Sequence, residues 1–141
     1  MADPLDPARR SRLMARIRSK DTKPEMAVRR MLHAMGCRFR LHRRDLPGNP
    51  DIVLPSRRLC IFVHGCFWHL HRNCPASHLP KSRKAWWRNK LEGNSARDKR
   101  RAAALRRLGW RVSAVWECQT KKPDRLLARL EKILGVAKPR G

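Results

Sequence analysis

The sequence predicts a small α/β domain built around a central mixed sheet, and three observations support this class. The chain of 141 residues is long enough for one hydrophobic core and short for two ordinary domains. Short apolar runs typical of strands occur together with longer stretches in which apolar residues recur at helical spacing. Their order is helix, three strands, a loop, helix, strand and helix, which favours helices packed on a sheet.

The chain begins with a basic segment, and the domain starts after it. Residues 1–21 are polar and basic, and Leu13, Met14 and Ile17 could form a short helix there. Thr22 and Glu25 have the spacing of a capping box, so a helix is predicted from this point to the residues before a glycine at position 36. The domain is expected to span residues 22–136, and residues 137–141 form a basic tail.

Three strands are predicted in the next part of the chain. Phe39 and Leu41 alternate with polar residues, which indicates a half-buried strand. Residues 46–50 form a turn rich in proline and glycine. Residues 51–54 and 59–63 are then two short apolar runs joined by a second turn, which predicts a hairpin.

The second half of the chain contains a loop, two helices and a strand. Residues 64–80 are expected to form an irregular loop. Residues 82–108 favour a helix that is interrupted near Gly93 and Asn94, with Ser95 as the N-cap of its second part. Residues 111–116 predict a fourth strand, and residues 123–134 predict a C-terminal helix.

The charge of the chain predicts a polyanionic partner. Lys and Arg total 35 against 11 Asp and Glu, which gives a formal net charge of +24. Like charges repel one another in a compact fold, so such an excess favours nucleic acid binding. The sequence has no long apolar run and no apolar signal core near its N-terminus. We therefore expect a cytoplasmic protein that does not enter a membrane.

Three cysteines and one histidine have the spacing of metal ligands. Cys66, His71 and Cys74 follow the pattern C-x4-H-x2-C, and Cys118 lies at the end of the last predicted strand. Three thiolates and one imidazole fill the tetrahedral shell of a closed zinc site, so we interpret the group as structural Zn²⁺. Two alternatives remain open: the thiols could be free or buried, or His78 could replace His71 as the ligand.

Asp51 is the first candidate for catalysis. It follows a Pro-Gly-Asn-Pro turn at the start of a predicted strand, where a carboxylate can hold a divalent metal ion. A Pro-Asp pair alone usually marks only a turn. In PD-(D/E)xK nucleases an acidic residue and a lysine stand on the following strand, but here Phe62 and His64 occupy those places, and phenylalanine cannot bind Mg²⁺. The remaining candidates for the chemistry are His64, His69, Glu25 and Asp98.

A larger set of residues, in order along the chain, matches one known family. The most specific segments are residues 61–69, with the sequence IFVHGCFWH, and the distant Trp116-Glu117-Cys118. The other matching positions are 12–14, 21, 22, 25, 46–48, 50, 51, 71, 74, 87, 90, 94, 97, 98, 108–112 and 115. From about residue 10 to residue 134 the chain therefore resembles the very short patch repair (Vsr) DNA mismatch endonucleases.

The resemblance implies a PD-(D/E)xK-like fold with a structural zinc and Mg²⁺-dependent hydrolysis of DNA. The family nicks DNA 5′ to the thymine of a T·G mismatch left by deamination of 5-methylcytosine. It implies that Asp51 holds Mg²⁺ together with the backbone carbonyl of Val63, where the family often has threonine. It also implies that His69 activates the attacking water. The residues expected to support this centre are His64, Asp98 and Glu25.

The same resemblance implies how DNA is recognised. Phe67, Trp68 and Trp87 are expected to enter the base stack beside the mismatch. Adjacent helical residues face different directions, so only one of Trp86 and Trp87 is expected to insert. The basic segment 1–21 is expected to contact DNA. We expect a monomer that acts on double-stranded DNA containing a T·G mismatch in the bacterial cytoplasm, at the nucleoid.

Each assignment has a structural alternative. Glu25 could serve only as a helix cap, and Asp98 could pair with Arg101 on its own helix. The two candidate histidines could be a surface residue and a strand-end residue, and the rings of Trp110 and Trp116 are expected in the core. Two other functions also fit parts of the sequence. They are a zinc-stabilised DNA-binding module without catalysis, and a nuclease of the same fold with a different substrate.

Overall fold

A computed structural model describes residues 22–135 of the chain. Its helices are α2 (Lys23–Ala34), α3 (Lys84–Arg107), α4 (Glu117–Thr120) and α5 (Pro123–Leu134). Its strands are β1 (Arg40–Leu41), β2 (Ile52–Leu54), β3 (Leu59–His64) and β4 (Arg111–Trp116). Single 3₁₀ turns follow β2 at Pro55–Arg57 and interrupt the long loop at Pro75–Ser77. The short helix predicted within residues 13–17 and both basic terminal segments lie outside the described residues.

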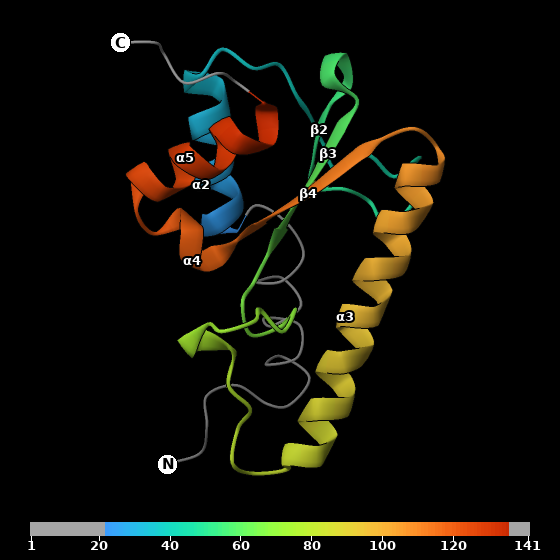
Figure 1. Cartoon of the computed structure of the whole chain (residues 1–141), viewed down its shortest axis with the longest axis vertical. Helices are drawn as coiled ribbons and strands as arrows, with labels where there is room; N and C mark the ends of the chain where they lie inside the picture. The colour runs from blue at the N-terminus through green and yellow to red at the C-terminus, as the bar shows by residue number, and fades with distance from the viewer. Residues whose placement is uncertain (1–21, 136–141) are drawn as a thin grey trace, which may run out of the picture.

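The strands form one mixed sheet, as the sequence predicts (Figure 1), and their order in it is β1-β2-β3-β4. The first three strands are antiparallel, whereas β3 and β4 run parallel. In this register His64 at the end of β3 lies beside Trp116 at the end of β4. The segments that leave these two strands therefore start at the same edge of the sheet, although they lie far apart in the sequence.

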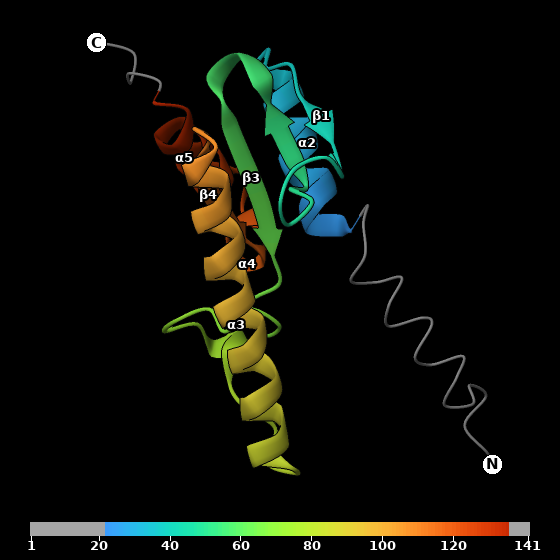
Figure 2. The same cartoon turned by 90° about the vertical axis from the view of Figure 1, so that its right-hand side faces the viewer.

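Helices cover both faces of the sheet, with α2 and α5 on one side and α3 on the other (Figures 1 and 2). Successive residues of a strand face opposite sides, so Ile52 and Leu54 join one core cluster while Val53 joins the other. Because β2 and β3 are covered on both faces, they appear in the sequence as continuous apolar runs. The larger cluster contains Val28, Leu32, Ile52, Leu54, Leu59, Ile61, Val115, Leu126, Leu130, Ile133 and Leu134.

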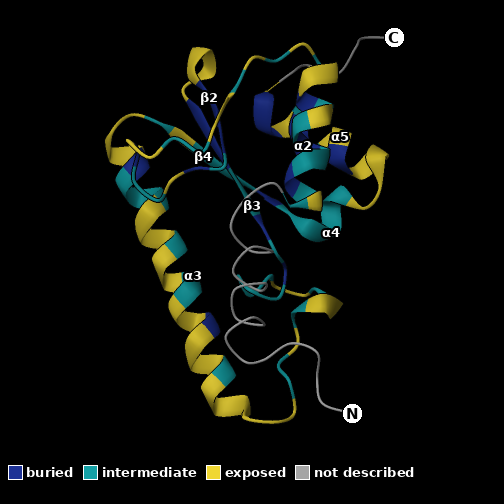
Figure 3. Cartoon of the chain, turned by 180° about the vertical axis from the view of Figure 1, so that it is seen from behind, coloured by how far each residue is buried: buried dark blue, intermediate teal, exposed yellow. Residues whose placement is uncertain are grey.

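Helix α3 is continuous over 24 residues, so the predicted interruption near Gly93 is wrong. The side chain of Asn94 does not compete with the helix backbone; its Nδ2 donates a hydrogen bond to the Trp68 carbonyl at 3.1 Å. Leu91 and Leu105 are the buried residues of this helix, and most of its length is exposed (Figure 3). Tertiary contacts at one face thus keep together a helix that local propensity would break.

Two turns hold the elements around Asp51. The Thr22 hydroxyl accepts a hydrogen bond from the Glu25 backbone N–H at 3.3 Å, which confirms the predicted start of α2. In the turn before β2, Gly48 has φ +77°, and a Cβ there would lie 2.8–3.0 Å from side-chain carbons of Arg101 in α3. Only glycine therefore lets this turn, which carries Asp51, approach α3 so closely.

Candidate active site and metal centre

The four predicted zinc ligands lie together at the shared edge of β3 and β4. Cys66, His71 and Cys74 come from the loop after β3, and Cys118 comes from the short helix α4 directly after β4. Their ligand atoms all lie within 4.8 Å of one another. Cys118 Sγ is 3.5 Å from His71 Nδ1, and the Cys118 backbone N–H donates to Cys66 Sγ at 3.4 Å. The parallel pairing of β3 and β4 thus brings the distant fourth residue to the loop.

This donor set fits a zinc ion. Zinc bonds of about 2.0–2.3 Å in a tetrahedron separate neighbouring ligand atoms by roughly 3.3–3.8 Å, which the Cys118–His71 distance matches. The His71 ring stacks on Trp116, with centroids 4.1 Å apart and planes at 9°, so its orientation is fixed. Trp116 therefore lies beside the candidate zinc ligands rather than in the core clusters. His78 is outside the group, and its Nδ1 contacts the Pro75 carbonyl at 2.6 Å.

Asp51 lies just before β2 and points toward β3. Its Oδ2 accepts a hydrogen bond from the Val63 backbone N–H at 2.7 Å. Burial raises the pKa of Asp51 to about 6; the Val63 N–H opposes this shift, and the nearby charge of Glu25 adds to it. Ionising this carboxylate costs free energy unless a cation lies nearby. A bound metal ion would supply that cation.

His64, His69 and Asp98 form a second group on the same side of the sheet. The rings of His64 and His69 stack with centroids 4.0 Å apart and planes at 21°. His69 Nδ1 lies 2.5 Å from Asp98 Oδ2, so Asp98 of α3 contacts His69 across the fold, not only residues of its own helix. Burial, and secondarily the charge of His69, lowers the pKa of His64 to about 4. Asp51 accepts the N–H of Val63, and the next residue, His64, stacks on His69, so the two groups lie next to each other.

Glu25 is 3% exposed and faces this site. Its carboxylate oxygens lie 3.3 Å from Arg29 Nη2 and 3.3 Å from His42 Nε2. Glu25, His42 and Asp51 form a further group whose ligand atoms lie close together. The N-cap contact of α2 involves the backbone N–H of Glu25, whereas its carboxylate contacts Arg29 and His42. Arg29 and His42 were missed by the sequence reasoning, although the i, i+4 spacing of Glu25 and Arg29 signals an ion pair.

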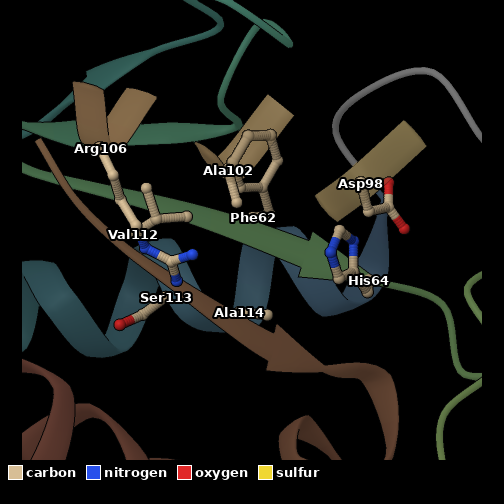
Figure 4. A pocket seen from close by; sticks show the side chains of 8 residues that line it. All are labelled: Phe62, His64, Asp98, Ala102, Arg106, Val112, Ser113 and Ala114. Atoms are coloured by element: carbon tan, nitrogen blue, oxygen red, sulfur yellow. The ribbon is translucent and has the colours of Figure 1, made fainter. Parts of the chain in front are cut away.

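A small pocket of about 130 Å³ separates β3 and β4 from α3 beside His64 and Asp98 (Figure 4). Phe62 of β3 lines this pocket. Its ring lies 5.8 Å from that of His64, at 23°. Phe62 thus forms an apolar wall of the pocket next to the stacked rings of His64 and His69.

The predicted stacking residues form one aromatic cluster. Phe67 and Trp68 lie in the turn after β3, and Trp87 lies near the start of α3. Centroid distances are 5.1 Å for Phe67–Trp68, 5.5 Å for Phe67–Trp87 and 5.9 Å for Trp68–Trp87. Trp86 is attached to this cluster through Trp87, whereas Trp110 packs against the core cluster under α3. The cluster thus joins the turn after β3 to the first part of α3.

Helix α3 connects these parts of the site. Trp87, Asn94 and Asp98 lie at helical spacing on one side, where they contact the aromatic turn, its backbone and His69. A single rigid helix therefore fixes the aromatic cluster relative to the histidine pair.

Within residues 22–135, none of the helices is both long and apolar enough to cross a lipid bilayer.

Comparison with known proteins identifies the family of this chain. The family model described as DNA mismatch endonuclease Vsr matches residues 2–75. The type II nicking enzyme V.XorIIP of Xanthomonas oryzae pv. oryzae is 58% identical over 134 residues, which cover 95% of this chain and 98% of that protein. The DNA mismatch endonuclease Vsr of Escherichia coli is 41% identical over 126 residues, covering 89% and 80%. The type II nicking enzyme V.NmeAIP of Neisseria meningitidis is 38% identical over 134 residues, covering 95% of each. The chain therefore belongs to the DNA mismatch endonuclease Vsr family.

Proposed function

We propose that this protein is a Mg²⁺-dependent endonuclease that nicks DNA 5′ to the thymine of a T·G mismatch arising from 5-methylcytosine deamination. The observation that carries the proposal is the partly buried Asp51 carboxylate, which accepts the Val63 N–H directly before His64, whose ring stacks on the His69 that contacts Asp98. A metal-binding carboxylate beside an oriented imidazole suits phosphodiester hydrolysis. Family membership directs this chemistry to mismatched DNA.

Asp51 and the backbone carbonyl of Val63 are the residues that would hold Mg²⁺. The burial of Asp51 supports this, because a cation would remove the cost of ionising the carboxylate. Mg²⁺ keeps several waters and needs only one or two protein carboxylates. When bound, it would offset the negative charge that grows on the phosphate during hydrolysis. Glu25, which contacts Arg29 and His42, lies at the edge of this proposed Mg²⁺ site.

His69 is the proposed general base. If its Nδ1–H donates to the Asp98 carboxylate, the neutral ring carries its lone pair on Nε2, where it can accept a proton from water. Asp98 then also favours the imidazolium that forms. The ring of His64 packs against His69 and restricts its rotation. The roles of His64 and Asp98 are thus to position the base rather than to touch the substrate.

The aromatic cluster is the proposed reader of the mismatch. A T·G pair costs less to unstack than a matched pair, so rings that enter the stack select it by deformability. Phe67, Trp68 and Trp87 are the residues assigned to this role. The structural zinc, held by Cys66, His71, Cys74 and Cys118, would keep the turn that carries two of these rings rigid.

We also propose the fold type, the DNA partner and the cellular location of this protein. The hairpin that carries Asp51 and the following strand correspond to the core of a PD-(D/E)xK-like fold, with Phe62 and His64 in place of the usual acid and lysine. The net charge of +24 suits double-stranded DNA, through counterion release. We infer action as a monomer in the bacterial cytoplasm, at the nucleoid.

A duplex panel tests this function. Duplexes of one sequence, differing only in a T·G, A·T or G·C pair at one position, are incubated with the protein and Mg²⁺, and each strand carries its own label. The expected product is one nick, 5′ to the mismatched thymine, on that strand only. Equal cutting of all duplexes would indicate a nuclease with another substrate. Binding without any nick would indicate a DNA-binding module.

A further inference from the structure

Trp86 is a large apolar side chain that is not among the proposed stacking residues. It is 48% exposed in the first turn of α3, next to Trp87. The end of α3 that carries it extends beyond the sheet, away from both core clusters (Figure 2). Isolated exposed aliphatic residues are common, but an exposed indole beside a functional aromatic cluster is more informative. Trp86 therefore marks a contact surface at the edge of the proposed mismatch site.

Trp86 differs from the proposed stacking residues in its exposure. Its centroid lies 5.0 Å from that of Trp87, and the two ring planes stand at 88°. Phe67, Trp68 and Trp87 are partly buried against one another, whereas Trp86 is exposed. Trp86 is thus available for a contact outside this cluster.

A cation accompanies this ring. The Arg83 guanidinium carbon lies 4.8 Å from the Trp86 centroid, so the two side chains form a cation–π pair. The exposed charged side chains around them, Lys81, Arg83, Lys84, Arg88 and Lys90, are all basic. A protein partner with an apolar surface would have to desolvate these charges, whereas a phosphodiester strand pairs with them. The surroundings of Trp86 thus favour a nucleic acid backbone as the occupant.

We propose that Trp86 and Arg83 form a backbone clamp, which contacts the sugar–phosphate strand flanking the mismatch. The indole face packs on a deoxyribose, and the guanidinium binds the adjacent phosphate. Such contacts position a protein on the duplex but carry no base information. The clamp therefore adds affinity for matched and mismatched DNA alike. This inference rests on the proposed function only for where the strand runs.

The test compares equilibrium binding of the full-length protein to matched and T·G duplexes, by fluorescence anisotropy without Mg²⁺ so that no strand is cut. Trp86→Ala should weaken both complexes by the same factor, roughly 5-fold, and leave their ratio unchanged. Trp87→Ala should instead reduce the ratio. Arg83→Ala should make the negative slope of log affinity against log salt shallower by about 1, because one phosphate contact is lost.

Two controls accompany these variants. Leu108→Ala removes another exposed apolar side chain, 55% exposed, at the opposite end of α3, and should leave both affinities unchanged. Trp86→Phe keeps a ring and should restore most of the affinity that Trp86→Ala loses. Zinc content and the thermal unfolding midpoint of each variant show that the fold is kept.

The outcomes that would overturn the clamp are distinct. Unchanged binding of both duplexes by Trp86→Ala would show that this ring does not touch DNA. Weaker binding of the mismatched duplex alone would show that it belongs to the stacking cluster. Because binding is measured without cleavage, a wild-type protein that never nicks would defeat the proposed function, yet an equal loss on both duplexes would still support the clamp.

Discussion

Replacing Asp51 with asparagine is expected to stabilise the magnesium-free protein while removing its activity. The partly buried carboxyl has a pKa of about 6 in the fold, against 3.8 as its ordinary value, mainly because desolvation disfavours the charge. One pKa unit corresponds to about 1.4 kcal/mol, so the ionised side chain costs the fold about 3 kcal/mol above both values. Asparagine keeps the shape, can still accept the Val63 N–H and carries no charge.

The size of this effect depends on pH. Below about pH 3, Asp51 is protonated in the folded and unfolded states, and the gain from asparagine should vanish. Between about pH 4 and pH 7 the unfolded chain loses this proton first, so the wild type loses stability relative to the variant. Urea unfolding of both proteins, in magnesium-free buffer without chelator so that zinc stays bound, measures the difference. The histidines are common to both proteins, so their titration largely cancels.

The outcome that would refute this reasoning is a stability difference between Asp51→Asn and wild type that stays constant from about pH 4.5 to pH 8. It would mean that the Asp51 carboxylate is not sheltered from water. Added Mg²⁺ provides a matched check at the higher pH. It should stabilise the wild type and have a smaller effect on the variant, because the charged ligand is gone.

The ligand group, the packing of the turn before β2 and the charge of the chain give three further expected outcomes. Cys118→Ser should release zinc and expose the loop of residues 64–80 to proteolysis, and full retention of zinc would contradict the ligand assignment. Gly48→Ala should cost roughly 2 kcal/mol of stability in thermal unfolding, through its positive φ and its contact with Arg101. Adding Arg101→Gly should restore part of this loss, and wild-type stability in the single variant would argue against the close packing. Affinity for DNA should fall steeply as salt rises, and a flat titration would exclude binding through phosphates.

The sheet could be predicted from sequence because its strands are short, apolar and bounded by turns. The predicted bounds of β4 and α5, residues 111–116 and 123–134, agree with the structure. Strand β1 is shorter than predicted, and α4 was not foreseen, because neither has a strong periodic pattern. The interruption of α3 was predicted wrongly because Gly93 and Asn94 have poor helix propensity. Their contacts with the rest of the fold were invisible at that level.

The site was predictable to different degrees. Three of the zinc-type ligands lie on one loop with recognisable spacing, but the position of Cys118 depends on the parallel pairing of β3 with β4. Asp98 was a candidate from family resemblance, yet only the structure pairs it with His69. His42 had no signal, because the pairing of β1 with β2 is what brings this residue beside Glu25 and Asp51.

The most direct test of the cleavage centre is to measure binding and nicking of one T·G duplex side by side, for wild type, Asp51→Ala and His69→Ala. With Mg²⁺ and saturating protein, the wild type should nick the thymine strand, and both variants should lose nicking by at least roughly a hundredfold. Binding should persist in both variants and should be equal or tighter for Asp51→Ala, which lacks a negative charge near the phosphate. An Asp51→Ala protein that nicks at the wild-type rate would contradict the account of the active site.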